Sequence, residues 1–85
     1  MRPEDMRVLR EQLIGLFASY LEDLESQEVR EEARTVYMNY KGQVAQLDED
    51  VAKAVQLLEG IGYSESRVPV TRVKEALAVL EAAHR

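Results

Sequence analysis

The 85-residue sequence has no cysteine and no tryptophan, only one histidine, two prolines and four glycines. Without cysteine, the chain cannot form disulfides, thiol nucleophiles, iron–sulfur clusters or cysteine zinc sites. No apolar run is long enough to span a membrane, and residues 1–7 lack the apolar core of a signal peptide. We therefore expect a cytoplasmic protein that has no membrane partner and no cofactor.

Charge and composition narrow the class further. The chain has 11 Lys and Arg against 16 Asp and Glu, a net charge of −5, and 46% of its residues are hydrophobic. An acidic chain is poorly suited to coating nucleic acid or an anionic membrane, and this length and apolar content predict one folded domain over residues 1–85. Arginine outnumbers lysine by eight to three, a bias typical of high-GC or thermophilic bacteria.

Residues 3–25 have the apolar periodicity of an amphipathic helix. The residues spaced three or four apart are Met6, Leu9, Leu13, Leu16, Phe17, Tyr20, Leu21 and Leu24. Pro3 suits the first helical turn, where no backbone donor is required. The pattern changes phase after Leu24, which predicts a tight turn with Ser26 as the N-cap of the next helix.

A longer stripe follows over residues 29–61. Its members are Val29, Ala33, Val36, Tyr40, Val44, Leu47, Val51, Ala54, Leu58 and Ile61. The spacing is that of a coiled-coil heptad with one extra step at Tyr40–Val44, and it predicts one long, kinked helix. Gly42 and the acidic residues 48–50 are the places where this helix can bend or restart. In the alternative interpretation the helix breaks near Asp48 and the chain forms a compact monomeric four-helix bundle.

The last helix is predicted over residues 67–83. Val70, Val73, Leu77, Leu80 and Ala83 share one face, flanked by Ala76 and Val79. With Ser66 as N-cap, Pro69 becomes the third helical residue, which needs no backbone donor. The expected fold is therefore all-α, an antiparallel arrangement of three helices with a long central helix.

Such a thin monomer leaves much of its long apolar stripe uncovered, so we expect dimerisation to complete a helical bundle. We expect the interface at Val36, Tyr40, Val44 and Leu47, midway along the long helix. No nucleophile–base arrangement can be assembled around a single histidine next to the C-terminus. The sequence thus favours a small non-enzymatic interaction module, such as an adaptor, regulator or assembly subunit, which forms a homodimer or binds a helical protein.

One alternative is DNA binding. The stretch GYSESRV at residues 62–68 resembles the turn and recognition-helix start of helix-turn-helix regulators. That resemblance implies that Arg67, Arg72 and Lys74 face DNA. Pro69 departs from the pattern because it falls inside the implied recognition helix.

A second alternative is a dimeric di-metal protein. Glu81 and His84 are three residues apart, as in the pairs that helical di-iron sites use, with Glu11 or Glu22 as further candidate ligands. A single histidine in a last helical turn is more typical of an interaction with the helix dipole. We therefore assign no metal, catalytic or cofactor-binding residue.

Overall fold

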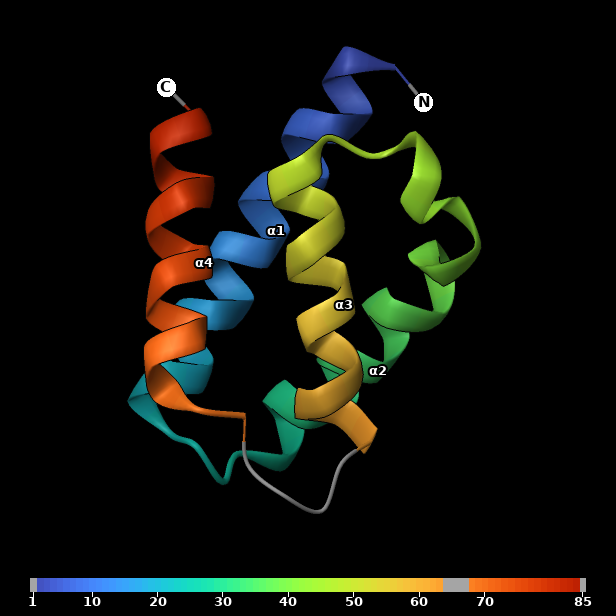
Figure 1. Cartoon of the computed structure of the whole chain (residues 1–85). Coiled ribbons are helices and arrows are strands. Elements are labelled where there is room, and N and C mark those ends of the chain that lie inside the picture. The colour runs from blue at the N-terminus through green and yellow to red at the C-terminus, as the bar shows by residue number, and fades with distance from the viewer. Residues whose placement is uncertain (1, 64–67, 85) are drawn as a thin grey trace.

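The computed structural model describes residues 2–63 and 68–84, and over these residues the fold is all-α (Figure 1). The first helix, α1, covers Pro3–Glu22 with Pro3 in its first turn, as the sequence predicts. Its apolar face, from Met6 to Tyr20, is buried against the other helices. No described helix has the length and apolar character needed to cross a bilayer.

The second helix, α2, spans Gln27–Tyr40 and begins at the predicted cap. The Ser26 side chain accepts a hydrogen bond from the Val29 backbone N–H at 3.3 Å. This bond satisfies one of the donors that a helix N-terminus leaves without a helical partner. The N-cap prediction is confirmed.

The prediction of one long central helix is wrong. After α2, the chain forms a short 3-10 helix, η1, at Lys41–Gln46, becomes extended at Leu47, and restarts as α3 at Glu49–Tyr63. The chain reverses direction at this break, so α3 lies beside α2 (Figure 1). The apolar spacing continues across the break because the apolar faces of α2 and α3 both pack into the same core. Periodicity therefore identified the buried residues but not the reversal between them.

The last helix, α4, covers Val70–Ala83, which is shorter than predicted. Pro69 is its N-cap, with φ −55° and ψ 132°, rather than its third residue. The pyrrolidine ring fits this position because the N-cap residue donates no backbone N–H to the helix, while its carbonyl still accepts from the Arg72 and Val73 N–H groups. The proposed cap Ser66 lies outside the described residues.

The helices form an up-down-up-down bundle measuring 33 × 25 × 17 Å, so the alternative of a compact four-helix bundle describes this chain (Figure 1). Each of the four α-helices contributes to one apolar core. Its largest fully buried side chains are Phe17, Leu9, Leu13, Leu16, Leu58, Leu80, Val36, Val51, Val55 and Val73. The apolar stripe is thus covered within one chain, and a coiled coil is not needed to bury it.

Helices α2 and α3 meet along a tightly packed line that we call the closed seam, formed by Arg34, Tyr37, Glu59, Gly62 and Tyr63. Arg34 Nε donates to the Gly62 carbonyl at 2.5 Å, and its guanidinium lies 5.7 Å from the Tyr63 ring centroid. The Tyr37 hydroxyl donates to Glu59 at 2.8 Å, and its ring meets Tyr63 edge-on. A Cβ on Gly62 would lie 2.8 Å from Arg34 Cγ and 3.2 Å from the Arg34 backbone nitrogen, so this approach requires glycine.

Candidate functional site: a groove between α3 and α4

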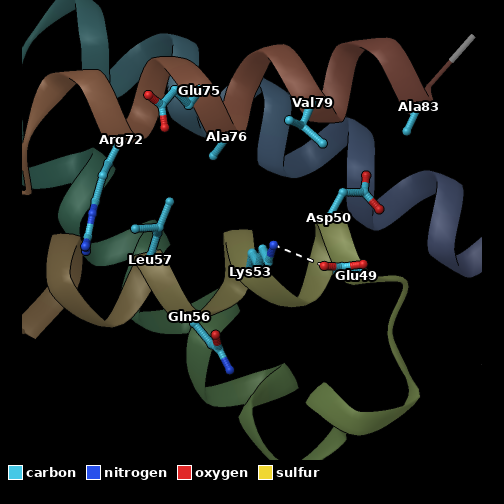
Figure 2. Close-up of a pocket in the computed structure, with 10 residues that line it drawn as sticks. All are labelled: Glu49, Asp50, Lys53, Gln56, Leu57, Arg72, Glu75, Ala76, Val79 and Ala83. Atoms are coloured by element: carbon cyan, nitrogen blue, oxygen red, sulfur yellow. Dashed lines mark ion pairs between the residues drawn. The ribbon is translucent and has the colours of Figure 1, made fainter.

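On its other side, α3 is separated from α4 by an open groove of about 850 Å³ (Figure 2). The groove is lined by Glu49, Asp50, Lys53, Gln56, Leu57, Arg72, Glu75, Ala76, Val79 and Ala83. On α4 these residues recur at steps of three and four, which places them on one helix face. That face adjoins the one that carries the buried Val73 and Leu80.

The centre of the groove is apolar. Leu57 and Ala76 are half-buried where the two helices approach each other, and Val79 is 53% exposed. An exposed valine is unremarkable when it stands alone, but here it borders a concave surface with further apolar side chains. The sequence carried a signal for this surface, because Ala76 and Val79 widen the apolar arc of α4 beyond its buried face.

Charged side chains lie at both ends of the groove. Glu49 and Asp50 are at one end, Arg72 and Glu75 are at the other, and Lys53 lies between them (Figure 2). Lys53 Nζ pairs with Glu49 at 3.1 Å. Within residues 2–63 and 68–84, neither Arg72 nor Glu75 forms an ion pair. The rim therefore has an alternating charge pattern that the described residues neutralise only in part.

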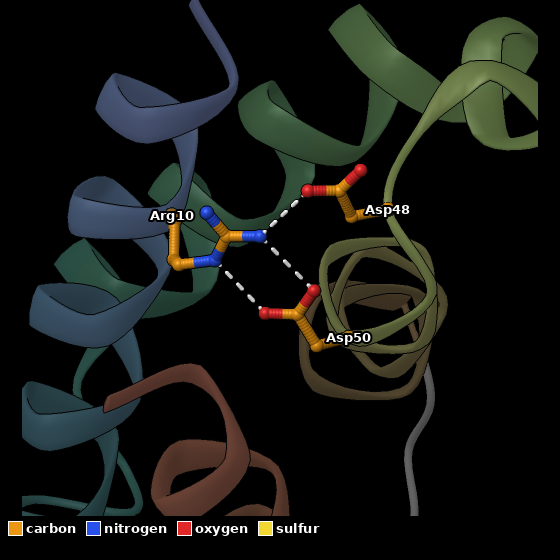
Figure 3. Close-up of polar contacts among 3 residues, drawn as sticks. All are labelled: Arg10, Asp48 and Asp50. Atoms are coloured by element: carbon orange, nitrogen blue, oxygen red, sulfur yellow. Dashed lines mark hydrogen bonds and ion pairs between the residues drawn. The ribbon is translucent and has the colours of Figure 1, made fainter. Parts of the chain in front are cut away.

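The end of the groove at Asp50 is fixed by a set of contacts that we call the Arg10 clamp (Figure 3). From α1, Arg10 donates to Asp50 through Nε at 2.9 Å and through Nη2 at 3.1 Å, and Nη2 also reaches Asp48 at 2.9 Å. The side chains of Arg10 and Asp50 are only 11% and 12% exposed. Such a paired arrangement fixes geometry as well as charge.

The clamp shifts the protonation equilibria of both partners. The hydrogen bond from Arg10 lowers the pKa of Asp50 below its ordinary value, against an opposing effect of burial. The same contact with Asp50 raises the pKa of Arg10. Asp50 is thus held as a carboxylate, and both of its oxygens accept hydrogen bonds from Arg10 of α1. Sequence periodicity could not find this contact because the two residues are 40 positions apart.

The four residues predicted at a dimer interface lie elsewhere. Val36 and Leu47 are buried in the chain's own core, with 2% and 9% exposure, and Tyr40 and Val44 pack partly against it. The reversal at η1 covers this part of the stripe with the chain itself. Val36 and Leu47 are therefore not accessible to a partner, whereas Tyr40 and Val44 remain partly accessible beside Met38, which is 54% exposed.

The two described residues of the DNA-binding alternative, Arg72 and Lys74, do not share one helix face. Arg67 lies outside the described residues, and Arg72 and Lys74 are both exposed. Two residues two positions apart on a helix point in directions that differ by about 160°. Arg72 lines the groove and Lys74 does not. Helices α3 and α4 also run side by side in opposite directions rather than crossing steeply as in a helix-turn-helix (Figure 1).

The structure brings two of the candidate metal ligands, His84 and Glu11, together. His84 Nε2 lies 3.3 Å from Glu11 on α1, which links the end of α4 to α1, and the other ring nitrogen of His84 is buried without a hydrogen-bond partner in the described chain. Glu22 ends α1 at the opposite end of the bundle (Figure 1). Across residues 2–63 and 68–84, no three acidic or histidine side chains gather closely enough to hold a metal ion.

Comparison with known proteins adds no family to this geometry. No protein-family model, no curated protein and no solved structure matches the chain. Any functional argument therefore depends on the groove and its charges.

Proposed function

We propose that this protein is a small non-enzymatic interaction module that binds an amphipathic helix in the groove between α3 and α4. The observation that carries the proposal is the half-exposed Val79 beside Leu57 and Ala76 on a concave surface with charged ends. Helix-in-groove recognition uses such surfaces: apolar side chains at i, i+3, i+4 and i+7 supply affinity, and rim charges select orientation.

The dimensions of the groove favour a helix over a small ligand. Its lining on α4 runs from Arg72 to Ala83, about 16 Å at the helical rise, or three turns. The groove is open to solvent rather than enclosed, whereas small-molecule sites bury most of the ligand. A partner helix of three or four turns matches this length and brings its own charges to the rim.

Charge decides the orientation of that helix. We expect basic residues on the partner opposite Glu49 and acidic residues opposite Arg72, because like charges placed directly across the rim are unfavourable. The apolar side chains of the partner then pack beside Val79. Lys53 can lie along the groove with its stem on the apolar surface and its ammonium at the rim.

A synthetic peptide tests the proposal. The probe is an 18-residue helical peptide with leucines at i, i+3, i+7 and i+10, lysines at one end and glutamates at the other. We expect binding in fluorescence anisotropy, with amide shift changes at Leu57, Ala76 and Val79 in heteronuclear NMR spectra. Val79→Glu should weaken binding at least tenfold, since it places a charge on the apolar surface.

The matched control is Val8→Glu. Val8 is 62% exposed on α1 and does not line the groove, so the same substitution there should leave peptide binding unchanged. Equal losses for both variants, or shift changes confined to α1 and α2, would contradict the proposal.

A further inference from the structure

The charges along the groove point to its occupant. We infer that the helix bound in the groove is α4 of a second copy of this chain, held in an antiparallel arrangement about a twofold axis. This inference rests on the proposed function and specifies the partner. It places the dimer interface on α3 and α4 instead of at residues 36–47.

The argument begins with the order of charges. From one end of the groove towards its centre, α4 presents Arg72 and then Glu75; from the other end, α3 presents Glu49 and then Lys53. The signs are therefore plus–minus from one end and minus–plus from the other. A twofold axis perpendicular to the helices brings opposite ends together, so Arg72 faces Glu49 of the second copy, and Glu75 faces its Lys53.

The spacing within each pair also agrees. Arg72 and Glu75 are separated by about 4.5 Å along the helix axis, and Glu49 and Lys53 by about 6 Å. A single position of the second copy along the helix axis therefore allows both the Arg72–Glu49 and the Glu75–Lys53 contact. A twofold axis parallel to the helices would instead place each charge opposite its own copy, which is unfavourable.

The apolar contacts fit the same axis. Val79 and Ala76 lie between the charged ends of the groove (Figure 2), so an axis through the middle of the groove would pass beside them. They would therefore pack against the same residues of the second copy, as a self-complementary twofold contact demands. A standard interface takes about 800 Å² per partner, a minor part of the 5476 Å² that the chain exposes.

Charge reversal in separate copies tests this arrangement. Native mass spectrometry and sedimentation equilibrium should give twice the 9.7 kDa mass for the unmodified chain. Arg72→Glu alone and Glu49→Arg alone should each weaken dimerisation about tenfold or more, because both symmetric contacts become repulsive. An equimolar mixture of the two variants should restore a heterodimer of near-original affinity, because each contact then pairs opposite charges.

Two controls accompany the mixture. Lys74→Glu makes the same charge change as Arg72→Glu on an exposed residue of α4 outside the groove, and it should leave dimerisation unchanged. Circular dichroism checks that each variant keeps the helical content of the original chain. Val79→Glu should dissociate the dimer without any charge reversal at the rim.

The outcomes separate this inference from the proposed function. A chain that is monomeric at millimolar concentration, but binds the 18-residue peptide through Val79, overturns only the second-copy inference. A dimer that resists Val79→Glu, or a mixture that fails to associate, overturns the twofold arrangement. A chain that neither dimerises nor binds the peptide overturns both proposals.

Discussion

The two sides of α3 are built differently. Towards α2, the closed seam brings backbones together at Gly62 and covers that contact with Arg34, Tyr37 and Tyr63. Towards α4, charged and apolar side chains line an open groove, and Arg72 has no ion-pair partner among the described residues. Helix pairing along a chain is therefore no guarantee of a closed interface. A glycine at the point of contact closes one side, while valine and charged residues leave the other available.

The largest expected effect comes from wedging the closed seam apart. Gly62→Val should lower the free energy of unfolding by about 3 kcal/mol, because its side chain would overlap Arg34. Chemical denaturation measures this loss. Gly15→Val is the control: a Cβ at Gly15 meets no other side chain or distant backbone within 4 Å, so the change there should be near zero. Equal losses for the two variants would show that the close packing of Gly62 against Arg34 is not what stabilises the fold.

The Arg10 clamp, at one end of the groove, should have the next largest effect. Asp50→Asn removes the main carboxylate partner of a nearly buried guanidinium and should cost about 2 kcal/mol. Asp48→Asn, at a side chain that is 59% exposed, should cost less than about 0.5 kcal/mol. Thermal denaturation of the two variants distinguishes them, and a larger loss at Asp48 would contradict this division.

The clamp also predicts a pH dependence. Because Arg10 lowers the pKa of Asp50 below its ordinary 3.8, the unfolded chain takes up this proton first as the pH falls. The contribution of Asp50 to stability is therefore complete above about pH 5 and is lost as the pH falls through the pKa of the folded state. Asp50→Asn should show a smaller loss of stability than the original chain between pH 5 and pH 2. Parallel denaturation curves for the two proteins would contradict the assignment.

A smaller effect is expected at the hydrogen bond between Tyr37 and Glu59 in the closed seam. The hydrogen bond to Glu59 raises the pKa of Tyr37 above its ordinary 10.0, so the folded protein retains this phenolic proton and stability from it declines at higher pH. Absorbance titration of the phenolic groups measures this ionisation step. Glu59→Gln should move that step to lower pH, whereas Glu31→Gln on the exposed surface of α2 should leave it in place.

The smallest effect on stability is expected at the groove. Val79→Glu should change the free energy of unfolding of the dissociated chain by no more than about 0.5 kcal/mol, because Val79 is 53% exposed. Denaturation at a concentration below dimerisation measures this value. A loss of several kcal/mol would show that Val79 stabilises the monomer by packing against α3, which would contradict an open groove.

The sequence predicted the helical class, the first helix, the Ser26 cap and nearly every member of the core. These follow from local periodicity and local hydrogen bonding, which need no knowledge of distant residues. It did not predict the reversal after Tyr40, because a stripe that keeps its phase fits both a straight helix and a helical hairpin. The contacts that distinguish the two shapes are distant in sequence: Arg10 with Asp50, and Arg34 with Gly62.

The groove was the least predictable feature. Ala76 and Val79 were visible as a widening of the α4 stripe, yet a wide stripe normally signals deeper burial. That a gap lies beside it depends on how α3 and α4 pack, which involves residues distant in sequence. The widened stripe therefore marks one wall of the groove in the sequence, but the gap itself is a property of the whole bundle.

The long sequence separation of the Arg10 clamp has a consequence for folding rates. The contact between Arg34 and Gly62 closes 28 residues and lies between helices joined by a short connection, whereas the clamp joins residues 40 apart and requires α1 to dock. Closing the larger loop costs only about 0.3 kcal/mol more, but the clamp also requires α1 to dock on a formed α3, so we expect the α2–α3 hairpin to assemble first. Gly62→Val should then mainly slow folding, and Asp50→Asn should mainly accelerate unfolding, because the clamp forms after the transition state.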